Sequence, residues 1–70
     1  MRLEPQVWQA LEEAAERLGI PINALCSRIN ARRRRTSLSS AVRVFVLEFY
    51  RGLAEGADPE TAAERALDRL

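Results

Sequence analysis

A run of apolar residues at helical spacing, near the middle of the chain, constrains the fold most. Between Thr36 and Arg51, and just beyond, large hydrophobic residues recur three or four positions apart, at Leu38, Val42, Phe45, Phe49 and Leu53. This period is typical of one face of an α-helix rather than of a strand, in which apolar and polar residues alternate. We expect this helix to begin at an N-cap on Ser37 or Thr36, to end at about Glu55, and to form the centre of the core.

Two further helices are expected before it. Pro5 suits the first turn of a helix that runs to Leu18, because the missing N–H of proline costs nothing there. Gly19 fits the left-handed position just past that helix. A second helix follows the turn at Pro21 and ends inside the run of four arginines at residues 32–35. Arg28, Arg32 and Arg35 would share one flank of this second helix.

The C-terminal segment carries a weaker pattern. Asp58 followed by Pro59 is a strong start signal, a cap and then a first-turn proline, for a fourth helix that runs to near Leu70. The apolar face of this helix is thin and is formed by Ala62, Ala63, Ala66, Leu67 and Leu70. We therefore expect it to pack loosely or to fray at its end. The chain is divided accordingly into a main domain, residues 1–56, and a C-terminal extension, residues 57–70.

The candidate core or dimer-interface residues are those on the apolar faces of the first three helices and of the segment before them. They are Leu3, Val7, Trp8, Leu11, Leu25, Ile29, Leu38, Val42, Phe45 and Phe49. Cys26 lies on the stripe of the second helix and is expected to be a small core residue. Tyr50 lies off the main stripe, where it either reaches a dimer interface or caps the edge of the core.

A chain of 70 residues can form only one small core, and such a core rarely supplies more than about 3–5 kcal/mol. The single cysteine excludes an internal disulfide, and the absence of histidine excludes the usual Cys/His zinc sites. Association with a second copy, most simply as a homodimer, is the remaining source of stability. No apolar run approaches the ~20 residues that span a bilayer, and a lone cysteine suits a reducing cytosol. We expect a soluble, cytoplasmic protein, and the exclusive use of arginine over lysine suggests a bacterial or phage genome.

Charge is strongly segregated along the chain. Residues 21–43 hold six arginines and no acid, whereas residues 1–20 carry a net charge of −2 and residues 44–70 one of −3. A basic segment attracts phosphate backbones through counterion release, and arginine also binds guanine edges with two hydrogen bonds. An acidic protein partner and a merely solvated helix end are the alternatives. Without histidine, a distinctive acid pair or a glycine-rich phosphate loop, we expect no enzymatic activity, no metal and no cofactor.

The order of the motifs resembles that of ribbon-helix-helix proteins of the Arc/MetJ type. The segment Leu3–Trp8 is similar to the strand-to-helix entry of that family, and Gly19–Leu25 is similar to the link between its two helices. Leu38–Glu48 resembles a bacterial subfamily that adds a third helix after an arginine-rich connection. The resemblance covers about residues 2–51.

The resemblance implies a mainly all-α homodimer in which the N-terminal strands of two subunits pair as an antiparallel ribbon that enters the major groove of DNA. Only Met1 to Glu4 precede the first helix here, so this strand is very short. The resemblance also implies that the N-terminus of the second helix binds a phosphate through backbone N–H groups. It maps Arg2 onto the ribbon and Ile22 and Asn23 onto the phosphate-binding turn. The charge pattern adds five candidate phosphate contacts: Arg28, Arg32, Arg33, Arg34 and Arg35.

The predicted function is therefore that of a DNA-binding transcriptional regulator of ribbon-helix-helix type. One alternative is a protein-interaction module whose arginine-rich segment docks an acidic partner and contacts no DNA. A third is a small structural or phage assembly protein.

Overall fold

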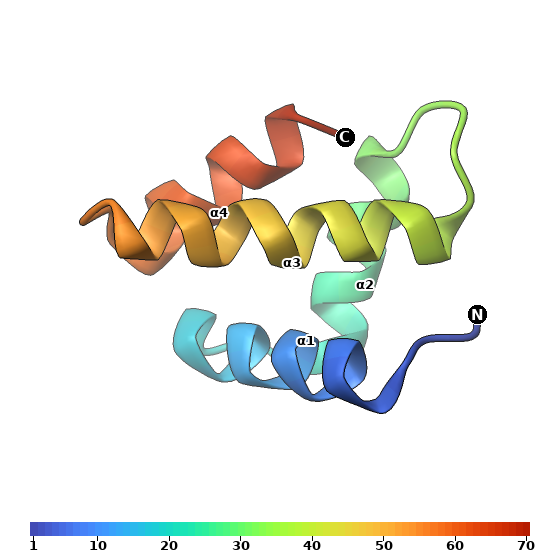
Figure 1. Ribbon diagram of the computed structural model, residues 1–70, viewed down its shortest axis with the longest axis horizontal. Coiled ribbons are helices and arrows are strands. Elements are labelled where there is room, and N and C mark those ends of the chain that lie inside the picture. Colours follow the sequence, from blue (N-terminus) through green and yellow to red (C-terminus); the bar gives the residue numbers. More distant parts are fainter.

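The computed structural model describes residues 1–70 as four helices and no strand (Figure 1). The helices are α1 (Pro5–Leu18), α2 (Ile22–Arg32), α3 (Leu38–Ala54) and α4 (Pro59–Asp68). α3 lies along the long axis of the molecule, with α1 on one side, α4 on the other and α2 crossing behind (Figure 1). The expected all-helical fold is confirmed, whereas Met1 to Glu4 form no strand in the single chain. None of the four helices combines the length and apolarity that crossing a bilayer requires.

α3 supplies the centre of the core. The rings of Phe45 and Phe49 are both fully buried and stack with their centroids 5.7 Å apart. This contact follows from their spacing of four, because residues one turn apart lie on the same face of a helix. Leu11 of α1 and Leu25 and Ile29 of α2 belong to the same buried cluster. The helix that carries the predicted apolar stripe is thus the one that the other helices cover.

Trp8 is the exception among the expected core residues. Its side chain is 40% exposed, so it lies outside the core of this chain. α1 packs through the face centred on Leu11, Ala14 and Ala15, and Trp8 lies at the margin of that face. The remaining residues of the set are fully buried, apart from three that are half-buried against the core: Leu3, Val7 and Leu38.

Two polar side chains lie at the edge of the core. Cys26 is half-buried, and burial raises the pKa of its thiol. The hydroxyl of Tyr50 donates a hydrogen bond to the carbonyl oxygen of Ala10 at 2.9 Å, and its ring meets that of Phe49 edge-on. Tyr50 therefore caps the core edge by joining α3 to α1, and burial raises the pKa of its hydroxyl.

The prediction that α4 packs loosely is wrong. Four of the five residues of its predicted apolar face are buried against the core, at Ala62, Ala63, Ala66 and Leu67. Leu70, beyond the last helical residue Asp68, is half-buried. The small residues on both helices let the backbones approach closely. A Cβ atom placed on Gly52 of α3 would lie only 3.0 Å from the Cβ of Ala62. A thin face of alanines thus packs closely because its partner helix presents a glycine at the point of contact.

The helix boundaries follow the predicted local signals. The side chains of Ser37 and Asp58 cap α3 and α4 by accepting hydrogen bonds from backbone N–H groups three residues further on, at 3.1 and 3.3 Å. Gly19 and Gly56 follow α1 and α3 in the left-handed conformation, with φ of 70° and 95°. Glycine adopts this conformation without the strain that a side chain would introduce.

The cap on α4 also predicts a pH dependence. Hydrogen bonds from the side chain and the backbone of Thr61 hold the pKa of Asp58 below its ordinary value of 3.8. Since the pKa is lower in the folded state, the stabilisation is present above the unfolded-state pKa and is lost as the pH falls through the folded-state pKa.

Asp58→Asn tests this assignment, because asparagine caps a helix as well as aspartate but does not titrate. We expect the melting temperature of the wild-type protein to fall relative to that of the variant as the pH is lowered from about 5 to about 2. Thermal unfolding followed by circular dichroism across this range measures the difference. Parallel curves for the two proteins would show that the carboxylate makes no pH-dependent contribution to capping.

Candidate nucleic-acid interface

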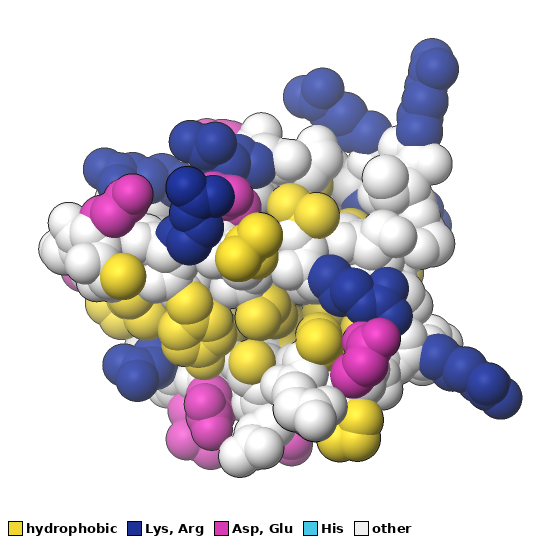
Figure 2. All heavy atoms as spheres, viewed as in Figure 1, with side chains coloured by type: hydrophobic (Ala, Val, Ile, Leu, Met, Phe, Trp, Pro, Cys, Tyr) yellow, Lys and Arg dark blue, Asp and Glu magenta, His cyan; other side chains and the backbone are white.

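Three basic residues that form no ion pair within the chain gather at one end of the molecule. The N-terminal segment, which carries Arg2, and the loop between α2 and α3, which carries Arg34 and Arg35, lie at the same end of the long axis (Figure 1). Figure 2 shows basic side chains extending into solvent from this end. All three arginines are exposed, and none makes an ion pair with an acid of the chain. Their guanidinium groups are therefore available to phosphate.

Arg33 instead shapes the loop in which it lies. Its Nε atom donates to Oδ1 of Asn30 at 2.7 Å, and its Nη1 atom donates to the backbone carbonyl of Thr36 at 2.9 Å. α2 ends at Arg32, and Arg33 already has an extended backbone, with φ −66° and ψ 148°. The expectation that Arg35 shares a helix flank with the preceding arginines is therefore wrong, because Arg35 lies beyond the helix.

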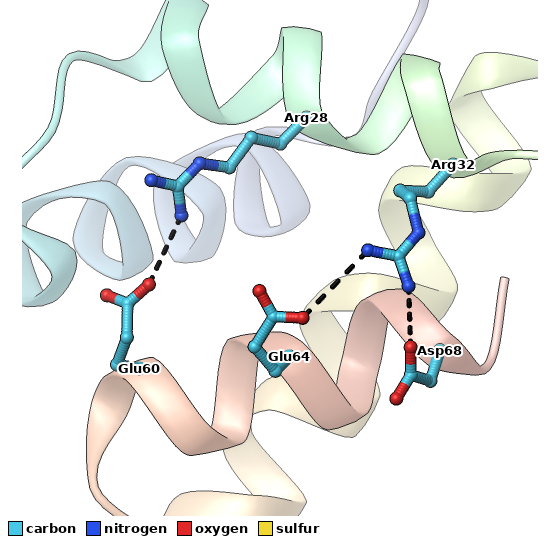
Figure 3. A network of polar contacts seen from close by, with 5 residues as sticks. All are labelled: Arg28, Arg32, Glu60, Glu64 and Asp68. Carbon is cyan, nitrogen blue, oxygen red and sulfur yellow. Dashed lines mark hydrogen bonds and ion pairs between the residues drawn. The ribbon is translucent and has the colours of Figure 1, made fainter.

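The two remaining arginines of the predicted set, Arg28 and Arg32, contact acids of α4 (Figure 3). Nη1 of Arg28 lies 3.4 Å from Oε1 of Glu60. Arg32 lies between two carboxylates, with Nη2 2.5 Å from Oδ1 of Asp68 and Nη1 3.9 Å from Oε2 of Glu64. The acids that contact Arg28 and Arg32 therefore belong to α4 of the same chain.

Sequence reasoning missed this arrangement, although a signal for it exists. The acids of α4 recur every four residues, as do Arg28 and Arg32 of α2, so each set forms one edge of its helix. What the pattern does not reveal is that these two edges face each other.

The N-terminal turn of α2 offers a different kind of contact. Asn23 is exposed and Ile22 is half-buried, and the backbone N–H of neither residue donates to an acceptor within the chain. Pro21, at the N-cap, supplies no side-chain acceptor. Free N–H groups at a helix N-terminus bind phosphate oxygens well. At about 1.5 Å per residue, the length of α2 separates this turn from the arginines at the other end of the helix.

An ion pair between residues distant in sequence holds the N-terminal segment in place. Arg43 of α3 binds the carboxylate of Glu4 with two hydrogen bonds, from Nε at 3.0 Å and from Nη2 at 3.3 Å. The hydrogen bond with Arg43 is the main reason why the pKa of Glu4 is lowered. The pair ties the segment that carries Arg2 to α3, and it occupies one more arginine of the basic middle segment.

A polar hollow of about 190 Å³ lies between the C-terminal half of α3 and α4. It is lined by Glu48, Arg51, Gly52, Glu55, Arg65 and Arg69. Both carboxylate oxygens of Glu48 are already paired, with Arg51 at 3.4 Å and with Arg69 at 3.3 Å. No group of His, Cys, Asp and Glu side chains in the structure is arranged to hold a metal ion.

Comparison with known proteins identifies one family. A family model described as the ribbon-helix-helix domain matches residues 1–50. The matched region contains α1, α2 and most of α3, together with every candidate DNA-contact residue, and α4 lies outside it. No curated protein and no solved structure matches the chain.

Proposed function

The chain belongs to the ribbon-helix-helix domain family, and from this membership we propose that it is a DNA-binding transcriptional regulator that acts as a homodimer in the bacterial cytoplasm. Proteins of this family typically bind DNA and form dimers, and the fold is not an enzymatic one. The match over residues 1–50 is the observation that carries the proposal. No observation favours docking of a separate acidic protein, since Arg28 and Arg32 already contact the acids of α4.

The proposed DNA surface combines two sets of groups that have no partner within the chain. Arg2, Arg34 and Arg35 would contact phosphates or groove edges from the end of the molecule where they gather. The N–H groups of Ile22 and Asn23 would bind a phosphate at the start of α2. In the dimer, pairing of the Met1–Glu4 segments would bring the two copies of Arg2 together at the major groove.

The apolar surface of the single chain supports the dimer. Large hydrophobic side chains stay exposed on the N-terminal segment, on α1 and on α3: Met1, Trp8, Val44 and Leu47. Figure 2 shows hydrophobic side chains gathered along α3 and over its junction with α1. A second copy that covered part of this surface would add to the stability of a small core.

Sedimentation equilibrium at micromolar concentration tests the dimer. We expect a species of twice the 7.9 kDa chain mass, with helical circular dichroism. Stability should also rise with protein concentration, because association favours the folded state by mass action. A folded monomer throughout the micromolar range would rule out the dimer.

DNA binding is tested by fluorescence anisotropy of a short labelled duplex over a range of salt concentrations. We expect the logarithm of the binding constant to fall linearly with the logarithm of the salt concentration, by about 0.9 for each phosphate contact. Arg34→Gln and Arg35→Gln should each weaken binding and reduce this slope by about one contact.

Arg65→Gln is the matched control, because Arg65 is an exposed arginine of α4 without an ion pair and lies outside the matched region. It should leave the slope unchanged. Proteins that bind DNA without sequence preference have dissociation constants of about 10⁻⁴–10⁻⁶ M at physiological salt. Affinity weaker than about 1 mM for any duplex at low salt would therefore end the proposal.

A further inference from the structure

The ion pairs between α2 and α4 form a continuous row. We call Glu60, Glu64 and Asp68 the acidic edge of α4. Its carboxylates face Arg28 and Arg32 in order along the two helices, so that each arginine contacts at least one acid (Figure 3). A phosphate backbone bound along α2 would present a similar row of anionic oxygens to Arg28 and Arg32.

The acids decide the sign of the charge on this side of the molecule. Two arginines face three acids, which leaves the row with a net charge of −1. Without the acids the same row would be positive and would continue, beyond the end of α2, into the loop that carries Arg34 and Arg35. The acidic edge thus neutralises the arginines of α2, so that on this side of the molecule the uncompensated positive charge lies only beyond the end of that helix.

Arg28 and Arg32 form ion pairs but remain accessible to solvent. The side chains of Arg28 and Arg32 remain 42% and 43% exposed, so water and a competing anion can reach them. Ion pairs between exposed side chains are individually weak. The acidic edge itself is fixed, because the alanine face of α4 is buried against α3. The acids therefore stay beside the arginines at a high effective concentration.

We propose that the acidic edge of α4 is an intramolecular competitor of DNA, which keeps Arg28 and Arg32 from phosphate and so lowers the affinity of the α2 surface. This inference rests on the proposed function, since it concerns how tightly the protein binds DNA. It requires no movement of α4, because the arginine side chains alone exchange one set of anionic oxygens for another. In the wild-type protein, Arg28 and Arg32 accordingly contribute little to DNA affinity.

The experiment compares duplex binding by three proteins over a range of salt concentrations. One is the wild type, and another is the acid-neutral variant Glu60→Gln/Glu64→Gln/Asp68→Asn. The third is the matched control Glu12→Gln/Glu16→Gln/Glu55→Gln, which removes as many negative charges from exposed acids that form no ion pair. We expect the acid-neutral variant to bind more tightly than the control. Its salt dependence should be steeper than that of the wild type by about 0.9 for each arginine released.

Adding Arg28→Gln/Arg32→Gln to the wild type and to the acid-neutral variant completes a double-mutant cycle. The two substitutions should weaken binding far more in the acid-neutral variant than in the wild type, and should remove most of the gain in affinity and slope that the acid-neutral variant shows. If the acid-neutral variant and the control gained the same DNA affinity over the wild type, the inference would be overturned, because the effect would then be one of overall charge. Removal of the arginines could also lower the DNA affinity equally in both backgrounds. That result would overturn the inference as well, because the arginines would then already contact DNA in the presence of the acids.

These two negative results leave DNA binding by the wild type intact, so they are distinct from a failure of the proposed function. If none of the proteins binds DNA, the proposed function and the inference fall together. Circular dichroism checks that each variant keeps the wild-type helix content. Asp68→Asn alone, compared with Glu55→Gln, repeats the test with the least disturbance, because it removes only the 2.5 Å contact near the end of α4. Asp68→Asn should bind DNA more tightly than Glu55→Gln.

Discussion

Phe45→Ala is expected to lower the free energy of unfolding by about 3–5 kcal/mol, as truncations of buried phenylalanine do. The ring is fully buried at the centre of α3 and stacks on Phe49, so its removal leaves a cavity that neighbouring helices can fill only in part. A single core of this size supplies only about 3–5 kcal/mol. The variant should therefore be largely unfolded at 25 °C, unless association with a second copy restores part of the loss.

Urea unfolding followed by circular dichroism, at one fixed protein concentration, measures the effect. Phe45→Leu should cost less than about 1.5 kcal/mol, because it keeps most of the apolar volume. Gln9→Ala, on the exposed face of α1, should change stability by no more than about 0.5 kcal/mol. A loss of less than about 1 kcal/mol for Phe45→Ala would mean that the core is not centred on this ring.

Gly52→Val is expected to cost about 1–3 kcal/mol by forcing α4 away from α3. Even a single added carbon at this buried position would lie 3.0 Å from the Cβ of Ala62, and valine adds two further methyl groups. The better helix propensity of valine offsets only a few tenths of a kcal/mol of this cost. Faster amide hydrogen exchange in α4 should accompany the loss, because that helix loses its closest contact.

Two controls separate crowding from propensity. Ala54→Val introduces the same side chain at an exposed position of α3 and should cost about 0.6 kcal/mol through propensity alone. In Gly52→Ala, a gain in helix propensity of about 1 kcal/mol opposes the close contact with Ala62, so its stability should lie well above that of Gly52→Val. If Gly52→Val were as stable as the wild type, α3 and α4 would not approach each other as closely as the structure shows.

Local signals were sufficient to predict the helices. The caps at Ser37 and Asp58 and the left-handed glycines after α1 and α3 act through backbone groups only a few residues away, so they are visible in the sequence. The stripe around Phe45 likewise identified the central helix, because its period depends only on helix geometry. The motifs of about residues 2–51 also indicated the ribbon-helix-helix family, which the family match over residues 1–50 confirms.

The packing of α4 could not be predicted in the same way. A thin face of alanines indicates weak burial when it is considered alone. It becomes a close contact because α3 presents Gly52 opposite Ala62, and that pairing depends on how the two helices cross. The same argument applies to Trp8, whose position on an apolar stripe indicated burial. The neighbouring helices cover a different part of that face.

The tertiary structure also determines which arginines of the predicted site stay unpaired. Along the chain, residues 21–43 form an uninterrupted basic segment with acidic segments on both sides. In the fold, Arg43 binds Glu4, and Arg28 and Arg32 contact the acids of α4, so the acidic flanks neutralise much of that segment. The number of arginines is a property of the sequence. Which of them stay free for a phosphate depends on the distances between side chains, and only the packing of the helices determines those distances.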